Sequence, residues 1–294
     1  MRDGNKSKLV APILDESAVP AIASVRVNPS DSQHIVDAMF LIHQIKITER
    51  IKTFRDFSDK FNNIIYNLPS DRIDVAGDRY DEPSTKDGCR GTRSKPKKSS
   101  RRRRKPVEKM ITLDLDFPTN DTEFNLFLKV KKNCTKLLNL LGTRLIANAP
   151  NDKTIVATGM FEDPEEVRSN KLSRIQLHSL ECDHEEADTR VIPPIVRCPS
   201  PYSFVVSNDT DTFVALLGNK EHFPNNKTVY LQRGRTDFIN VTSVAENLEA
   251  KGVNLKFLPL MHALTGCDQT SYLHNVGKVT AFSVYLEHQV RKLN

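Results

Sequence analysis

Residues 203–217, SFVVSNDTDTFVALL, contain the pattern that decides the fold class. An apolar run typical of a buried strand is followed by Asp209 and Asp211 and then by a second apolar run. Similar units recur along the chain, in which short apolar runs predict strands and longer stretches with helical spacing predict helices. Strands that alternate with helices predict an α/β fold with a mostly parallel central sheet flanked by helices.

The predicted elements extend over most of the chain. Strands are expected at 34–36, 72–76, 154–157 and 203–206, with a strand-like pair at 228–231 and 238–241 and further strands at 23–27 and 110–113. Helices are expected at 38–47, 53–67, 122–141 with a stop at Gly142, near 164, within 184–196 up to Pro193 and Pro194, and at 244–251.

The domain organisation follows from local composition. Residues 1–33 contain three prolines and little periodicity, so we expect a loosely ordered lead-in. One domain is expected over 34–290. Residues 81–121 are polar, basic and proline-containing, and they predict a disordered insertion within that domain.

The basic charge is concentrated in residues 93–105. This run carries nine Lys and Arg side chains and no acidic one, whereas the whole chain has a net charge of +6, so the remainder is mildly acidic. A run of like charge repels itself, cannot pack, and favours a polyanion as partner, nucleic acid first. A nuclear-import signal or a plain flexible loop explains the run equally well.

Several classes of protein are excluded by simple features. No apolar run approaches the ~18 residues that span a bilayer, and the first residues lack a secretory signal, so we expect an intracellular protein without membrane contact. Five scattered cysteines without a CxxC pair predict reduced thiols. The phosphate-binding loop GxxxxGK[ST] is absent, which disfavours a nucleotide-driven motor.

Acidic side chains adjoin the predicted strands and helix starts. They are Asp37, Asp78, Glu186, Asp188, Asp209, Asp211 and Asp268. Taken singly, an aspartate after a strand most often caps a helix or forms a turn. Together at one edge of a sheet, seven carboxylates would repel one another unless cations were bound. Two Mg²⁺ or Mn²⁺ ions would satisfy them, and could activate a water and stabilise a leaving oxygen in phosphodiester cleavage.

The sequence blocks that carry these residues resemble the flap-endonuclease (XPG-type) branch of the PIN-like nucleases. In order they are IVDAMFLI, VAGDRYDEPSTKDGCR, HEEADTR, VVSNDTDTFVALL and LTGCDQTSYLHNVGKVTAF, between residues 35 and 282. The chain is also similar to long eukaryotic proteins with EADTR, DTD and HALTGCD blocks, some associated with mobile elements. The resemblance implies a PIN-like domain whose metal ligands are the seven acidic residues. Asp74 or Asp81 are alternatives to Asp78.

The resemblance also implies residues that bind nucleic acid. Asn275–Lys278 and the apolar stretch after it resemble the family's helix-hairpin-helix segment, so Gly277 and Lys278 would grip a duplex. Lys86, Arg90 and Arg93 fall where the family places basic residues near the scissile phosphate. Arg101, Arg102, Arg103 and Arg104 would add to the contact with the polyanion.

We therefore expect a Mg²⁺- or Mn²⁺-dependent, structure-selective endo- or exonuclease, in the nucleus, that acts on DNA or RNA and most readily on branched or flapped DNA. One alternative is a PIN-like nucleic-acid-binding or assembly module without catalysis. Another is a haloacid-dehalogenase-type phosphatase, in which Asp209 attacks phosphorus and Asp211 serves as acid and base.

Overall fold

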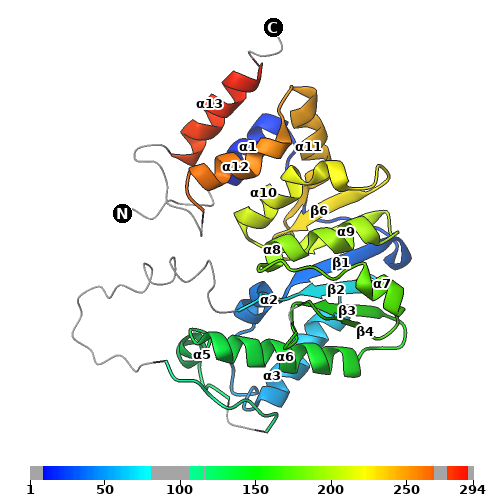
Figure 1. Ribbon diagram of the computed structural model, residues 1–294, viewed down its shortest axis with the longest axis vertical. Helices are drawn as coiled ribbons and strands as arrows, with labels where there is room; N and C mark the ends of the chain where they lie inside the picture. Colours follow the sequence, from blue (N-terminus) through cyan, green and yellow to red (C-terminus); the bar gives the residue numbers. More distant parts are fainter. Residues whose placement is uncertain (1–8, 81–105, 115–116, 164, 268–276, 291–294) are drawn as a thin grey trace, which may run out of the picture. The chain divides into compact units, whose positions relative to one another are not determined.

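The structure is a computed structural model that describes residues 9–80, 106–114, 117–163, 165–267 and 277–290 (Figure 1). These residues divide into two compact units. The described residues between 28 and 198 form the middle unit. Residues 9–27, together with the described residues from 199 onward, form the terminal unit.

Four strands form the sheet of the middle unit, in the order β4-β3-β2-β1. Their bounds are Ser32–Asp37 (β1), Arg72–Ala76 (β2), Thr154–Thr158 (β3) and Val167–Ser169 (β4). β2 is parallel to both β1 and β3, whereas β4 runs antiparallel to β3. The first three strands are buried along nearly their whole length, as is common for parallel strands, although β1 and β2 include buried polar side chains such as His34 and Asp74.

The helices of the middle unit lie on this sheet. They are η2 (Pro29–Asp31), α2 (Ala38–Gln44), α3 (Phe54–Tyr66), α5 (Asp121–Phe127), α6 (Lys131–Ala147), α7 (Arg174–His178), α8 (Ala187–Arg190) and α9 (Ile192–Arg197). A capping box of Thr53 and Asp56 starts α3. Helices α3 and α6 lie side by side (Figure 1). The rings of Phe57 on α3 and Phe124 on α5 pack against the ring of Phe117, with centroid distances of 4.9 and 5.2 Å.

Several predictions for the middle unit are wrong. The helix expected at 122–141 is two helices, α5 and α6, and Gly142 is buried inside α6 instead of ending it. Residues 110–113 form no strand, and strand β4 follows the place where a helix near 164 was expected. Pro193 and Pro194 lie in the first turn of α9, because the first N–H groups of a helix need no partner within it.

Two strands of the middle unit approach each other unusually closely just after they end. A Cβ atom on Gly77, which follows β2, would lie 2.6 Å from the carbonyl oxygen of Gly159, which follows β3. A Cβ atom on Gly159 would lie 2.5 Å from the carbonyl oxygen of Gly77, and Gly159 has a φ of +66°. Both positions therefore require glycine.

A buried histidine lies inside β1. The Nδ1 atom of His34 is 2.7 Å from Oγ of Ser70, which is itself 2.6 Å from Oγ of Ser32. Burial, and to a smaller extent the positive charge of Lys153, lowers the pKa of His34 from 6.5 to about 4. His34 is therefore neutral in the folded protein at neutral pH.

Three strands form the sheet of the terminal unit, in the order β5-β6-β7. They are Tyr202–Val206 (β5), Thr228–Gln232 (β6) and Phe238–Asn240 (β7), and β6 is parallel to β5 and antiparallel to β7. The helices are α1 (Val10–Ser17), α10 (Thr210–Gly218), η3 (Lys220–His222), α11 (Val241–Ala250), η4 (Leu255–Phe257), α12 (Leu258–Leu264) and α13 (Lys278–Val290).

Helix α1 lies within the segment expected to be a loose lead-in. Its residues Val10 and Ile13 are buried, and it packs against α11. The Asn247 side chain of α11 donates a hydrogen bond to the carbonyl oxygen of Ser17 over 2.9 Å. This part of the N-terminal region is thus an integral element of the terminal unit.

The prediction of an α/β fold with mostly parallel strands is confirmed by these pairings. Within the described ranges, no helix is both long and apolar enough to cross a membrane. The PIN-like topology and the helix-hairpin-helix segment remain predictions, and residues 268–276 of that segment lie outside the described residues.

Candidate functional site

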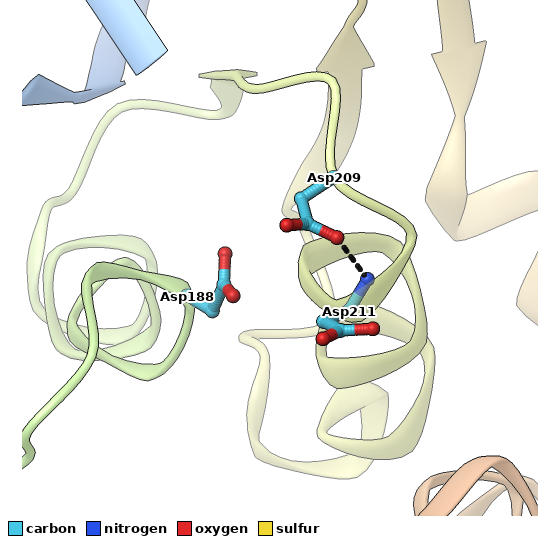
Figure 2. Close-up of side chains that lie close together, drawn as sticks. All are labelled: Asp188, Asp209 and Asp211. Atoms are coloured by element: carbon cyan, nitrogen blue, oxygen red, sulfur yellow. Dashed lines mark hydrogen bonds between the residues drawn. The ribbon is translucent and has the colours of Figure 1, made fainter. Parts of the chain in front are cut away.

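Asp209 and Asp211 lie where β5 passes into α10. Asp209 is the N-cap of α10, and its Oδ1 atom accepts a hydrogen bond from the backbone N–H of Asp211 over 3.0 Å (Figure 2). The Ser207 hydroxyl accepts a bond from the N–H of Asp209 over 3.2 Å and lies 3.1 Å from Oγ1 of Thr212. These short-range bonds fix the turn that presents both carboxylates.

Asp211 is the first member of a buried chain of polar groups. Its Oδ1 atom lies 2.6 Å from Nε2 of His262 on α12. The Nδ1 atom of the same ring lies 2.8 Å from Nζ of Lys278, the first residue of α13. His262 is 4% exposed and Lys278 is 7% exposed, so the chain is shielded from water.

Asp37 is the last residue of β1, and Asp78 lies two residues beyond the end of β2. Asp37 caps α2 by accepting a bond from the N–H of Phe40 over 3.0 Å. Asp78 accepts a bond from the N–H of Ala187, at the start of α8, over 2.9 Å. Burial lowers the pKa of His43 on α2, and the negative charge of Asp78 opposes this shift.

Glu186 and Asp188 open α8, which confirms that this acidic pair begins a helix. Glu186 is the N-cap residue, although its side chain makes no capping bond, and Asp188 lies in the first turn. Carboxylates near a helix N-terminus are favoured by the helix dipole. The position of Asp78, which binds the N–H between these two residues, adds a third carboxylate to the start of α8.

Three of the seven predicted ligands form a group suited to a cation. One carboxylate oxygen from each of Asp188, Asp209 and Asp211 lies within 4.8 Å of the other two (Figure 2). Oxygen ligands on opposite sides of Mg²⁺ are about 4.2 Å apart, and around Ca²⁺ about 4.8 Å, so this spacing fits a hard cation. The three aspartates can therefore hold a metal ion.

The remaining predicted ligands are placed differently. Among the described residues, Asp37, Asp78 and Glu186 do not belong to the group of three aspartates. Asp268 lies outside the described residues, as do Lys86, Arg90, Arg93, Arg101, Arg102, Arg103 and Arg104. Gly277 is exposed and precedes α13, whereas the buried ammonium of Lys278 bonds within the fold.

Asp74, an alternative to Asp78, has a different environment. It lies in the middle of β2, is 1% exposed, and forms an ion pair with Arg72 over 2.9 Å. Although burial disfavours the charged guanidinium, the Asp74 carboxylate raises the net pKa of Arg72. Asp74 is therefore committed to a contact inside the sheet. The other alternative, Asp81, lies outside the described residues.

Arg190, in the same ADTR block as Asp188, was not singled out by the sequence patterns. Its side chain is fully buried, and Nη1 lies 3.4 Å from Oγ1 of Thr158 and 3.7 Å from Sγ of Cys182. The Nε and Nη2 atoms have no hydrogen-bond partner among the described residues. Burial lowers the pKa of Arg190, and the negative charge of Asp78 opposes this shift.

A small pocket lies beside Asp78 in the middle unit. Its lining includes Asp78, Arg79, Tyr80, Gly159 and Glu162. Arg79 joins this lining to the loop before α8, because its N–H donates to the carbonyl oxygen of Glu185 over 2.8 Å. The pocket is therefore walled by the residues that follow β2 and β3.

Comparisons of the chain with family models, with curated proteins and with solved structures found no match. The resemblance to PIN-like nucleases therefore stays a prediction from the sequence blocks.

Proposed function

We propose that this protein is a divalent-metal-dependent nuclease that hydrolyses phosphodiester bonds. The observation that carries the proposal is the convergence of Asp188, Asp209 and Asp211, whose ligand oxygens lie within 4.8 Å of one another. A set of oxygen ligands without cysteine or histidine suits Mg²⁺ or Mn²⁺ better than zinc or copper.

The surroundings of the aspartates support a cation. Three negative charges at this separation repel one another strongly, and a bound cation relieves that repulsion. The Asp209 carboxylate is held by the backbone N–H of Asp211, and the Asp211 carboxylate by the His262 ring, so both need little reorganisation on binding. When bound, the metal would polarise a phosphate oxygen and neutralise the charge that develops during cleavage.

The basic run at 93–105 supports nucleic acid as the substrate class. Nine positive side chains within this run supply the sequence-independent attraction to phosphates that nucleic-acid-binding proteins use. The same run suits nuclear import, which agrees with a substrate found in the nucleus. In this proposal, Asp188, Asp209 and Asp211 bind the metal and the basic run captures the polyanion.

The test uses the purified full chain with labelled flap, splayed and hairpin DNA and RNA, with Mg²⁺, Mn²⁺ or EDTA. We expect metal-dependent cleavage that falls by roughly 100-fold or more in Asp188→Asn and Asp211→Asn, because each change removes a ligand charge. Asp163→Asn is the control, since it removes the charge of an exposed carboxylate outside the group of three aspartates. Like Asp209, Asp163 accepts a bond from the N–H two residues later, over 3.0 Å.

The outcomes separate the competing functions. Equal cleavage by wild type and the two ligand variants, or cleavage in EDTA, contradicts a metal site at these aspartates. Tight binding of nucleic acid without cleavage under any condition supports the assembly-module alternative. Hydrolysis of a small phosphomonoester that is lost in Asp209→Asn, without cleavage of nucleic acid, supports the phosphatase alternative.

A further inference from the structure

We infer that Lys278 and His262 are positioning residues that act in series to hold the Asp211 carboxylate for cation binding. The inference rests on the proposed function and extends it to two residues that need not touch the metal or the substrate. It is carried by a run of short contacts, all inside the terminal unit, from Nζ of Lys278 through the His262 ring to Oδ1 of Asp211.

The Lys278 side chain contacts both the ring and the backbone of His262. Its ammonium lies 2.8 Å from Nδ1 of His262, 3.1 Å from the His262 carbonyl oxygen and 3.4 Å from Oγ1 of Thr265. An ammonium group donates hydrogen bonds and accepts none. With Lys278 in its protonated form, the Nδ1 atom of the ring is therefore the acceptor and carries no hydrogen.

The His262 ring links Lys278 to Asp211. A neutral imidazole with an unprotonated Nδ1 carries its hydrogen on Nε2. Nε2 lies 2.6 Å from Oδ1 of Asp211, so the ring donates to that oxygen. Lys278 thus selects the tautomer, and the tautomer turns His262 into a donor that is aimed at the carboxylate.

The Asp211 carboxylate can accept the bond from His262 and bind a cation at the same time. A carboxylate offers about four lone-pair positions, so a bond from His262 leaves capacity for a cation. Hydrogen bonds to ligating carboxylates fix their orientation, and losing such an outer partner typically weakens metal binding 10- to 100-fold. Because His262 is 4% exposed, water cannot readily replace it as the donor.

The metal-binding test measures Mn²⁺ affinity of the full chain by the electron paramagnetic resonance signal of the free ion. We expect His262→Leu to weaken binding about 10- to 100-fold. His262→Gln, whose amide nitrogen can take the place of Nε2, should restore affinity to within about threefold of wild type by preserving the donor. His222→Leu is the matched control, because His222 also lies beside a carboxylate, Glu221, but is 61% exposed.

The role of Lys278 is tested by measuring which nitrogen of the His262 ring carries the hydrogen. In a long-range ¹H–¹⁵N spectrum of the full chain, wild-type His262 should show a protonated Nε2 and an unprotonated Nδ1. Lys278→Met should lose that distinction and Lys278→Arg should retain it. Lys256→Met serves as the control, since Lys256 pairs with Glu221 while remaining 62% exposed.

The results that would overturn the inference are distinct from those that would overturn the nuclease proposal. If wild type binds Mn²⁺ and His262→Leu binds it equally well, the positioning role is wrong while the metal site stands. A protonated Nδ1 in wild type, a ring unchanged in Lys278→Met, or His262→Gln as weak as His262→Leu also overturns it. If wild type binds no Mn²⁺, both proposals fall.

Discussion

Asp78 accepts a hydrogen bond from the backbone N–H of Ala187 over 2.9 Å, although the two residues are 109 positions apart in the sequence. Asp78 follows β2, and Ala187 is the first residue of α8. The bond satisfies one of the N–H groups that every helix leaves open at its start. It also adds a third carboxylate to the start of α8, where Glu186 and Asp188 lie. The Asp78 side chain therefore both caps the helix and contributes to this group of acidic residues.

Replacing Asp78 separates these two roles. Asp78→Ala should lower the free energy of unfolding by about 1 kcal/mol, as for the loss of a helix cap, whereas Asp78→Asn keeps the acceptor and should cost less. Urea unfolding followed by circular dichroism measures both. If Asp78→Asn folds normally and still loses Mn²⁺ affinity, the charge has a role in metal binding, and unchanged affinity restricts Asp78 to the cap.

Breaking the buried pair of Arg72 and Asp74 should affect stability alone. Asp74→Ala leaves an unpaired guanidinium in the interior, and we expect a loss of about 3–5 kcal/mol. The double variant Arg72→Met with Asp74→Leu should recover much of that loss, because no charge is left buried. Denaturant titration measures the recovery. Mn²⁺ affinity well below that of wild type in a folded double variant would contradict a purely structural role.

The buried His34 predicts a pH dependence of stability. Its pKa is about 4 in the folded protein, against 6.5 for an ordinary histidine, so folding favours the neutral ring. This contribution is fully present above pH 6.5 and is lost as the pH falls toward 4, by up to about 3 kcal/mol. His34→Asn can keep a contact with Ser70 without titrating in this range, so guanidinium unfolding at pH 7.5 and 4.5 should show a smaller acid loss in the variant. An equal acid loss in both proteins would place the effect elsewhere.

Metal removal should destabilise the wild-type protein and leave a ligand variant unaffected. A ligand present at about 100 times its dissociation constant stabilises the folded state by about 2.7 kcal/mol. Thermal melts with Mg²⁺ or Mn²⁺ and with EDTA should therefore differ for wild type, whereas Asp209→Asn should melt equally in both. Since asparagine also caps helices well, a general loss of stability in this variant would be unexpected.

The strands were predictable because parallel strands are buried on both faces. The bounds of β2 match the predicted 72–76, and β3 and β5 each extend the prediction by one residue. The break between α5 and α6 has no such signal, because residues 128–130 contain neither proline nor glycine. It depends on Asn133, whose side chain donates to the carbonyl oxygens of Phe127 and Val107 over 2.9 and 3.2 Å. Contacts of that kind appear only once the chain has folded.

The candidate site was likewise predictable only where local sequence patterns determine the structure. The sequence identified Asp209 and Asp211 because they follow a predicted strand, and Asp188 because it opens a predicted helix, and both signals are local. It did not identify His262 or Arg190, because their roles depend on residues distant in sequence: His262 meets Asp211 from 51 positions away. The sequence also could not show whether Asp37 and Asp78 accept capping bonds or bind a metal, because both roles use the same carboxylate.

The close approach of Gly77 and Gly159 constrains how this protein can vary. A crowded side chain can be shortened to admit a neighbour, but a main-chain carbonyl cannot, so no change elsewhere can compensate for a bulkier residue at either position. A library selected for folded molecules should return glycine at both places, even from backgrounds rich in other substitutions. Asp78 is the next residue after Gly77, so the requirement for glycine at position 77 also fixes the backbone beside Asp78.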